Sequence, residues 1–468
     1  MSEARLKRQH REFAWVWVLL VLVLSVAAGI CVTVLLWGGT RAEHRDAFDT
    51  GWKSAAAVLA ILAAVITVER LRLSQREHYR QLVADEARRE ADRAAQITDL
   101  SSKASEQLGN EKAAVRIGGL TDLERLARSH PSLQQTVADR ICAYLRAPYK
   151  PPPLLTTKLH NKPVQEISDD EIADRRLELD VRRTAQQILQ RHLHWPKNVD
   201  EVPDDFWADI RLDLRDAVLV DFNLDDARLE VAVFDNARFL GYTSFGNARL
   251  LGPTSFNYAT FNDADFTRAW FIGPVRFEGV SFSGRATFRR AKFAEAAQFT
   301  DASFAGAANF EDGLFNSTCT FYGASFAEEA SFAKASFIMR ANFDHVSFSD
   351  SVTFDDCVFS MQATLAGATF AKRSSFLKAR FSAEANFVHA SFLGDALFDG
   401  AYFTKLAIFD DVKFGGTTTI DNATYYMKGS FYRINLPASS KLDTRSENRR
   451  PVKPEVHDDD RNNRSSNS

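Results

Sequence analysis

The chain of 468 residues is long enough for more than one domain, and its formal net charge of -3 gives no global case for binding nucleic acid. Its cysteines are far apart and form no CxxC pair, which excludes a disulfide framework and a cysteine-based zinc site (Cys31, Cys142, Cys319 and Cys357). Phenylalanine is over-represented, with 37 residues against 10 tyrosines and 7 tryptophans, so we expect one packing position to recur many times.

An N-terminal tail at residues 1–12 precedes a long apolar segment at 13–37, in which Ser25 and Thr33 are the only polar side chains. As a helix this segment would span roughly 37 Å, enough to cross a hydrocarbon core of about 30 Å. A cleaved signal peptide is the alternative, but the apolar region of such a peptide has only about 7–15 residues. The segment therefore predicts a transmembrane helix over 13–37.

A second apolar run occupies residues 55–68 and is short for a membrane crossing by itself. It reaches adequate length when it is extended back through Ala47, Phe48 and Trp52, with Lys53 directed towards the membrane surface. We predict a second transmembrane helix over 51–68, joined to the first by an external loop at 38–50. A buried helix of a soluble domain is the alternative.

Basic residues predict the orientation of this hairpin. Eight Lys or Arg residues flank it on the outer sides of the two apolar runs, against three between them. The eight are Arg5, Lys7, Arg8, Arg11, Arg70, Arg72, Arg76 and Arg80, and the three are Arg41, Arg45 and Lys53. Because cytoplasmic flanks carry the excess of cations, we expect a multi-pass protein of the plasma membrane with both termini in the cytoplasm.

The residues after the second apolar run favour helices. A stalk is predicted at 69–104, where helix formers dominate and neither Gly nor Pro occurs in 69–98. Its apolar residues keep no heptad rhythm, so homo-oligomerisation through a coiled coil is left open. A helical domain is predicted at 105–200, with a helical hairpin at 110–147.

A further helix in this domain is predicted to begin after Ser168, which stands at capping-box spacing from Glu171. His192 and His194 lie two residues apart at its end and would point to different faces. Packing or pairing with the helix dipole is therefore the better interpretation of these histidines than a metal site.

A five-residue rhythm of Leu and Phe begins near residue 211 and later alternates between five and six residues. Two interleaved series with a step of eleven residues begin at Phe277 and Phe282. Together they contain 28 positions, of which 25 are Phe. A small residue, mostly Ala, stands two positions before each one, and Cys319 and Cys357 occupy this same position.

This spacing excludes a helix and favours short strands. A step of five residues turns a helix by about 500°, which would place successive Phe side chains roughly 140° apart. The small-x-Phe pair has a period of two instead, so both of its side chains would point inward from one strand. The intervening Gly, Asp, Asn, Ser, Lys and Glu residues suit corners and solvent-exposed positions.

The stretches LRDAVLVDFNLDDARL and ASFAGAANF resemble the pentapeptide-repeat proteins in their Phe-rich, five-plus-six form. The apolar hairpin followed by EQLGNEKAAVRIGGLTDLERLA also resembles membrane-anchored actinobacterial members of that family. The resemblance implies a right-handed quadrilateral β-helix over 207–434, with four repeats in each coil of 22 residues. The fold class is thus an α+β multidomain protein: two transmembrane helices, a helical region and a β-helix, followed by a disordered tail at 435–468.

We find no motif for a phosphate loop, an activated nucleophile or a metal site, so we expect no catalytic residue, no cofactor and no enzymatic activity. The acidic pairs Asp355–Asp356 and Asp410–Asp411 are interpreted as solvated surface. The expected function is a membrane-tethered scaffold that binds unidentified proteins on its β-helix faces and the lipid bilayer through 13–37 and 51–68. No nucleic-acid partner is expected.

Two alternative functions remain open. One is a DNA-mimicking inhibitor of DNA gyrase, as the family resemblance implies. Residues 211–430 contain 26 acids and 20 bases, however, a net charge of -6 that is too mixed for a persuasive phosphate mimic. The other is an unrecognised enzyme within the helical region.

Overall fold

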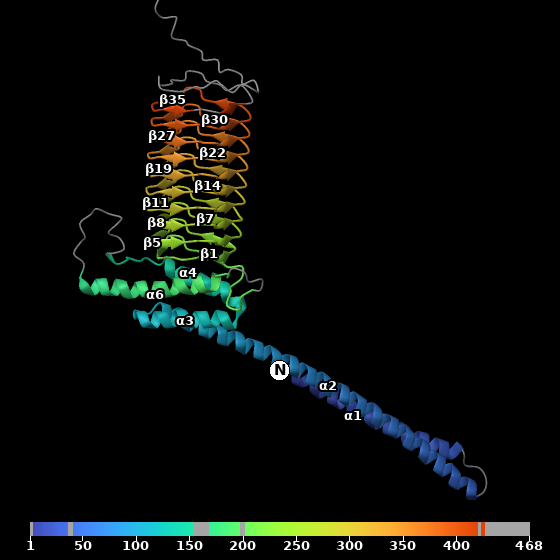
Figure 1. The fold of residues 1–468 in the computed structure, drawn as a ribbon. Coiled ribbons are helices and arrows are strands. Elements are labelled where there is room, and N and C mark those ends of the chain that lie inside the picture. Colours follow the sequence, from blue (N-terminus) through green and yellow to red (C-terminus); the bar gives the residue numbers. More distant parts are fainter. Residues whose placement is uncertain (1–2, 36–40, 154–167, 197–201, 420–422, 426–468) are drawn as a thin grey trace, which may run out of the picture. The chain divides into compact units, whose positions relative to one another are not determined.

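The computed structural model describes residues 3–35, 41–153, 168–196, 202–419 and 423–425. The chain divides into two compact units, Met1–Thr98 and Asp99–Ser468, which are described separately below (Figure 1). The predicted disordered tail at 435–468 lies outside the described residues.

The first unit contains helix α1 (Glu3–Leu35) and most of helix α2 (Arg41–Leu108). Because α2 already begins at Arg41, the predicted external loop at 38–50 is helical from residue 41 onward. The segment RAEHRDAFDT is rich in helix formers and contains neither Gly nor Pro, so nothing in it stops a helix. Hydropathy alone marked this segment as a loop, and hydropathy does not report where a helix begins.

Small residues bring α1 and α2 close together. A Cβ atom added to Gly51 would lie 2.5 Å from Thr33 Oγ1 and 3.1 Å from the Gly29 carbonyl oxygen, so only glycine fits there. Thr33 donates its hydroxyl to the same Gly29 carbonyl, at 2.5 Å. Close contact at small residues is the usual way in which membrane helices pack.

Apolar side chains cover the outside of these helices; Leu19, for example, is 63% exposed and Ile61 is 65% exposed. Among the described residues, one helix is long and apolar enough to cross a membrane, Asp49–Leu108 within α2. The described apolar part of α1, Leu19–Leu35, is shorter. The unit therefore contains one candidate membrane span, at the place of the second predicted helix, although a signal sequence also fulfils these criteria of length and composition. The first predicted span, at 13–37, remains a prediction.

The second unit begins with a helical region that contains α3 (Ala113–Ser129), the 3-10 helix η1 (Pro131–Leu133), α4 (Gln134–Arg146) and α6 (Asp169–Leu193). The predicted cap is confirmed, because the Ser168 hydroxyl accepts a hydrogen bond of 3.3 Å from the Glu171 amide. Leu120, Ile141 and Ile188 are among the buried residues that these helices share.

The end of α2 also belongs to this helical region. Ala104 is buried, and a Cβ atom on Gly119 of α3 would lie 2.9 Å from the Ala104 carbonyl oxygen. The two helices therefore touch through their backbones.

A solenoid of 37 short strands follows, and its strands form four parallel ladders. The first ladder contains β1 (Arg211–Asp213), β4 (Val231–Val233), β7 (Thr254–Ser255), β10 (Val275–Arg276), β14 (Ala297–Gln298), β18 (Cys319–Thr320), β22 (Ala341–Asn342), β26 (Ala363–Thr364), β30 (Ala385–Asn386) and β34 (Ala407–Ile408). The second contains β2 (Val218–Val220), β5 (Arg238–Ser244), β8 (Thr260–Asp265), β11 (Ser281–Phe282), β15 (Ser303–Phe304), β19 (Ser325–Phe326), β23 (Ser347–Phe348), β27 (Thr369–Phe370), β31 (Ser391–Phe392) and β35 (Lys413–Phe414).

The third ladder starts from the second halves of β5 and β8, which turn a corner. It continues through β12 (Ala286–Thr287), β16 (Ala308–Asn309), β20 (Ala330–Ser331), β24 (Val352–Thr353), β28 (Ser374–Ser375), β32 (Ala396–Leu397) and β36 (Thr418–Thr419). The fourth contains β3 (Arg228–Leu229), β6 (Arg249–Leu250), β9 (Trp270–Phe271), β13 (Lys292–Phe293), β17 (Leu314–Phe315), β21 (Ser336–Phe337), β25 (Val358–Phe359), β29 (Arg380–Phe381), β33 (Tyr402–Phe403) and β37 (Thr424–Tyr425).

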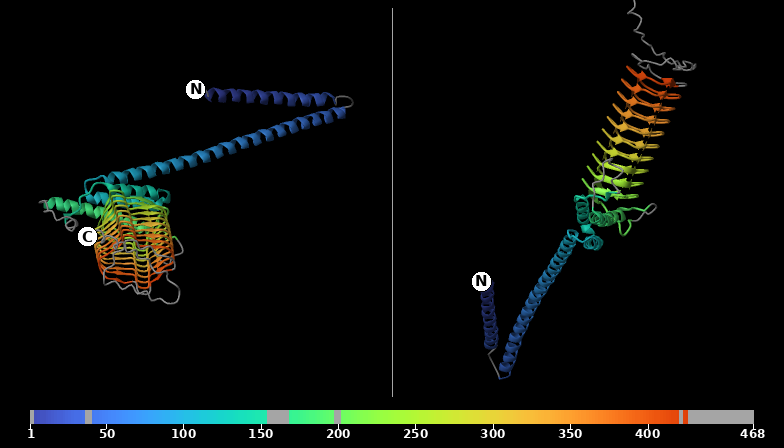
Figure 2. Two further views of the ribbon diagram at one scale, coloured as in Figure 1. Left: turned by 90° about the horizontal axis from the view of Figure 1, so that it is seen from above. Right: turned by 90° about the vertical axis from the view of Figure 1, so that its left-hand side faces the viewer.

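The register confirms the predicted coil of 22 residues. Ala286 pairs with Ala308, and Phe293 pairs with Phe315. Seen from its end, the solenoid has the predicted four-sided outline (Figure 2). The first and fourth ladders contain ten strands each, in agreement with the ten coils expected from the length of the repeats. The hand of the coil stays a prediction.

The rings predicted to point inward form the core. All 25 Phe residues of the two series are buried, and so is Leu365, which replaces a ring in one column. Within a column, rings one coil apart stack in parallel: the centroids of Phe288 and Phe310 lie 4.7 Å apart, with planes inclined by 1°. Columns from the first and third ladders meet edge to face across the core, as Phe299 and Phe310 do at 5.6 Å and 90°. Both arrangements are favourable for aromatic pairs.

The predicted corners follow the Phe positions of the first and third ladders. The second residue after these Phe positions has a positive φ in most coils, whether it is Gly279 (φ 60°), Arg268 (φ 58°) or Lys334 (φ 59°). Such a conformation costs a non-glycine residue about 1–2 kcal/mol, which the stacked coils on both sides must offset. A corner occupied by a residue other than glycine therefore projects its side chain away from the core.

Candidate interaction surface

The outward positions of the strands form straight columns on each face of the solenoid. On the second ladder, Ser281, Ser303, Ser325 and Ser347 pair in successive coils. Coils are stacked about 4.8 Å apart, so a face offers one outward side chain per rung. A surface of this kind can contact an extended segment or a flat partner over several coils.

Acidic residues directly after a Phe position connect adjacent coils. Asp344 Oδ1 accepts hydrogen bonds from the Thr364 hydroxyl and, at 2.8 Å, from the Ala366 amide. Asp355 makes the same pair of contacts with Ser375 and Leu377, at 2.5 and 3.0 Å. The interpretation of Asp355 as simple solvated surface was therefore wrong. The available sequence signal was an Asp after the Phe with a Ser or Thr twenty residues later, a distance just short of one coil.

The second acid of each predicted pair occupies a corner. Asp356 is exposed with φ 56°, and Asp411 has φ 55°. Asp411 Oδ2 lies 3.7 Å from Nδ1 of His389, a corner residue one coil below. No group of three or more His, Cys, Asp or Glu side chains suited to hold a metal was found in the described parts of the chain.

His192 is a packing residue, as predicted. It is fully buried and stacks on Trp207 with a centroid distance of 4.3 Å, whereas His194 is exposed. His192 Nε2 lies 2.9 Å from Glu124 Oε1, and Nδ1 lies 2.5 Å from the Asp205 carbonyl oxygen. Burial opposes the ionisation of Glu124, but the hydrogen bond with His192 and the charge of Arg191 outweigh burial and lower the pKa of this carboxyl group.

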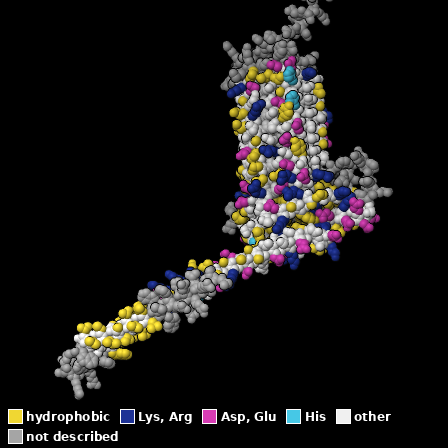
Figure 3. Space-filling view, turned by 180° about the vertical axis from the view of Figure 1, so that it is seen from behind, with side chains coloured by type: hydrophobic (Ala, Val, Ile, Leu, Met, Phe, Trp, Pro, Cys, Tyr) yellow, Lys and Arg dark blue, Asp and Glu magenta, His cyan; other side chains and the backbone are white. Residues whose placement is uncertain are grey.

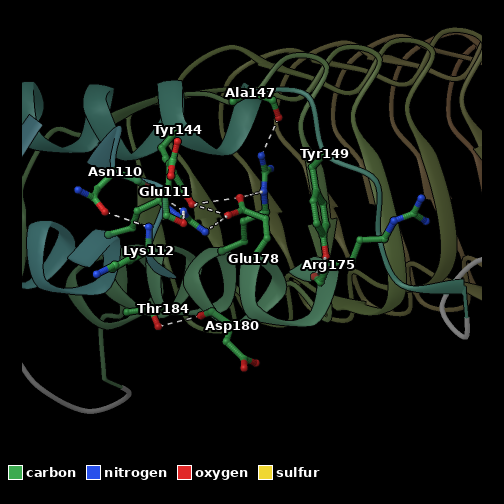
Figure 4. A network of polar contacts seen from close by, with 12 residues as sticks. Asn110, Glu111, Lys112, Tyr144, Ala147, Tyr149, Arg175, Glu178, Asp180 and Thr184 are labelled. Carbon is green, nitrogen blue, oxygen red and sulfur yellow. Dashed lines mark hydrogen bonds and ion pairs between the residues drawn. The ribbon is translucent and has the colours of Figure 1, made fainter. Parts of the chain in front are cut away.

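A polar network centred on Glu178 of α6 joins the helices of this region (Figure 4). Its carboxylate accepts hydrogen bonds from Arg116 (3.0 Å), from Tyr144 (2.9 and 3.0 Å) and from Arg182 (2.8 Å). Arg182 is buried and also donates to the carbonyl groups of Leu145 and Ala147, at 2.8 and 2.7 Å. Sequence reasoning missed this network because its members are spread over 67 positions.

The network holds the helices of this region together. The Arg182 guanidinium lies over the Tyr149 ring, at 4.5 Å from its centroid. Burial raises the pKa of Tyr144 and of Tyr149 to about 12, so both phenols stay protonated near neutral pH and are poor bases there. The predicted enzyme alternative in the helical region gains no support from this site.

Two glutamines complete the open edge of the first coil. The Gln186 side chain donates to the Val220 carbonyl at 2.8 Å and accepts from the Val220 amide at 3.1 Å. Gln135 bonds in the same way to both backbone groups of Arg211, at 2.9 Å each. The Gln186 amide thus replaces the neighbouring strand that β2 lacks on this side. The Gln135 amide does the same for β1. Helices α4 and α6 therefore cap this end of the solenoid, and the cap protects an edge that would otherwise pair with other chains.

The buried cysteines have no reactive character. Burial raises the pKa of Cys142 to about 12 and the pKa values of Cys319 and Cys357 far above their usual range. Cys319 and Cys357 lie in the small-residue columns, as predicted.

The family model described as pentapeptide repeats (9 copies) matches residues 234–281 and 245–292 of this chain. The solenoid is a pentapeptide-repeat domain. The comparisons found no curated protein and no solved structure that matches the chain.

Two segments of the pentapeptide-repeat domain differ in net charge. Residues 228–292 contain nine Lys or Arg and five Asp or Glu, a net charge of +4. Residues 293–425 contain eight Lys or Arg and sixteen Asp or Glu, a net charge of -8. Figure 3 shows one side of the solenoid, on which Lys and Arg side chains gather over the coils next to the helical region. The net charge of -6 for the whole domain conceals this difference.

Proposed function

We propose that this chain is a scaffold that binds other proteins on the faces of its pentapeptide-repeat solenoid and is held at the membrane by α1 and α2. The observation that carries the proposal is that inward and outward positions of each coil have different roles. Inward positions are filled by stacked rings, while outward positions form straight columns of side chains on each face. Binding is what such a surface offers, and the proposal assigns it no reaction.

The membrane anchor rests on the candidate span in α2 and on the close contact at Gly29 and Gly51. Both helices expose apolar side chains on their described parts, as lipid-facing helices do. The excess of cations outside the apolar runs supports a cytoplasmic position for both termini. A reporter fused after Ser468 tests this topology: activity in the cytoplasm supports it, and activity on the outer side contradicts it.

The binding function is tested by crosslinking in intact cells. A photoreactive residue at outward Ser303 or Ser325 should crosslink to discrete proteins. The same residue in a chain that also carries Phe332→Asp, which disrupts the core, should lose those crosslinks. Crosslinks that are absent from outward positions in all four ladders would contradict the scaffold. The gyrase alternative receives less support, because a basic segment at 228–292 is a poor copy of duplex DNA.

A further inference from the structure

The basic coils contain a cluster of cations on one face, which we call the basic strip: Arg228, Arg249, Arg268 and Lys292. Three of them are outward residues of the fourth ladder, on β3, β6 and β13. Arg268 is the corner residue just before β9 and projects from the same edge. The strip covers four successive rungs, or roughly 14 Å along the solenoid.

Trp270 holds two of these cations in place. It pairs in register with Arg249 on one side and with Lys292 on the other. Both cationic groups lie over its ring, each at 5.8 Å from the centroid. The two neighbours come from the coils on either side of Trp270. Cation–π attraction therefore spaces the two charges on the face of the solenoid.

The strip lacks acidic partners of its own. None of the four cations forms an ion pair of 4.0 Å or less with a described residue, in contrast to Arg290 and Arg289, which pair with Asp312 and Glu311 in the next coil. Arg249, Arg268 and Lys292 are exposed, and Arg228 is half-buried with its guanidinium over Trp195. Four uncompensated cations on one flat face attract a polyanion.

We propose that the basic strip binds an acidic segment of a partner protein, about five extended residues long, the length that 14 Å allows. This inference rests on the proposed scaffold function and names the chemistry of its partner. Nucleic acid fits less well, because two cations already lie 5.8 Å from the centroid of the Trp270 ring and would compete with a base that stacks on it.

The test uses the full chain in a non-ionic detergent and a fluorescein-labelled peptide of ten glutamates, with binding followed by fluorescence anisotropy. One variant reverses the strip: Arg249→Glu, Arg268→Glu and Lys292→Glu. A matched variant makes the same change of charge in higher coils: Lys334→Glu, Lys378→Glu and Arg380→Glu. These three residues are exposed and occupy the same corner column and the same ladder as the strip.

We expect the strip variant to bind at least about tenfold more weakly than the natural chain and the matched variant to stay within about twofold, with affinity falling as salt rises. Equal losses in both variants, or no binding by the natural chain at low salt, would overturn the proposal. Tighter binding of a ten-nucleotide thymidine strand, sensitive to Trp270→Ala, would assign the strip to nucleic acid instead. A dimer in sedimentation that only the strip variant dissociates would identify the acidic coils of a second copy as the occupant. The crosslinking experiment above tests the scaffold separately, because its crosslinks do not depend on this strip.

Discussion

The solenoid and its helical cap are stabilised in opposite ways. In the solenoid one contact, a ring stacked on the ring of the next coil, recurs along each column. In the cap each polar contact occurs once, and Glu178 alone joins Arg116, Tyr144 and Arg182. A repeated contact can be lost at one position, as it is where Leu365 replaces a Phe in one column. A contact that is made only once has no substitute.

This difference explains where sequence variation can be tolerated. A solenoid is approximately a sum of coil and interface terms, so its stability is spread over many similar contributions. The cap concentrates several charges and edge contacts in a few residues. The stability of the cap should therefore be sensitive to the replacement of its polar residues. The stability of the solenoid should be sensitive to substitutions that place a charge among its rings.

The largest expected effect comes from a charge inside the solenoid. Phe332→Asp would bury a carboxylate among rings at 4.8 and 4.9 Å and should lower the free energy of unfolding by at least about 4 kcal/mol. Glu328→Lys, at an exposed position of the same coil, should change it by less than about 0.5 kcal/mol. Urea unfolding of the full chain in detergent measures both. Equal stability of the two variants would mean that the inward assignment is wrong.

The second effect tests the network in the cap. Glu178→Gln leaves the buried Arg182 without its carboxylate and should cost about 3 kcal/mol. Glu171→Gln removes an exposed carboxylate from the same helix, where it pairs with Arg175, and should cost less than about 1 kcal/mol. Thermal unfolding followed by helix circular dichroism compares them. A cost for Glu171→Gln as large as that for Glu178→Gln would contradict the special role of the network.

A smaller effect tests the edge contacts. Gln186→Leu leaves both backbone groups of Val220 without a partner and should destabilise the cap by about 1–3 kcal/mol. Gln187→Leu, at the next and exposed position, is the control. Hydrogen exchange of the Val220 amide reports the edge directly. Unchanged protection in the Gln186 variant would show that another group covers this strand.

The smallest effect is a dependence on alkaline pH. The pKa values of Tyr144 and Tyr149 are raised to about 12, above the ordinary value of about 10 that applies in the unfolded chain. Their contribution to stability is therefore complete below pH about 10 and is lost as pH rises towards 12. The ultraviolet absorbance of phenolate should show a late titration step that disappears in the double variant Tyr144→Phe and Tyr149→Phe. Titration of both residues with the exposed tyrosines would contradict their burial.

The repetitive part of the fold could be predicted from the sequence because the same spacing of Phe residues recurs in successive coils. The spacing of Phe277, Phe288 and Phe299 gives the coil length, the inward face and the corners together. The start of α2 at Arg41 could not be read from hydropathy, because a solvated helix and a loop are equally polar.

The cap and the strip were harder to predict for different reasons. Gln135 and Gln186 are ordinary helix residues in sequence, and only the fold brings each beside an unpaired strand edge. The basic strip was hidden because Arg249, Arg268 and Lys292 are far apart in the sequence and the domain as a whole is acidic. Counting the charged residues of each coil separately, instead of over the whole domain, would have revealed the basic strip.

The most direct test of the scaffold compares the four faces of the same two coils. Each variant places two glutamates on one face: Arg276 and Gln298 on the first ladder, Ser281 and Ser303 on the second, Thr287 and Asn309 on the third, or Lys292 and Leu314 on the fourth. Two measurements are made on each variant, the free energy of unfolding and the capture of crosslinked proteins from intact cells.

We predict that none of these variants lowers the free energy of unfolding by more than about 1 kcal/mol, because all the replaced side chains point away from the rings. Capture should fall sharply for one face or for two adjoining faces. Capture that survives all four variants, or that falls only in step with lost stability, would contradict the claim that the outward columns of this solenoid bind its partners.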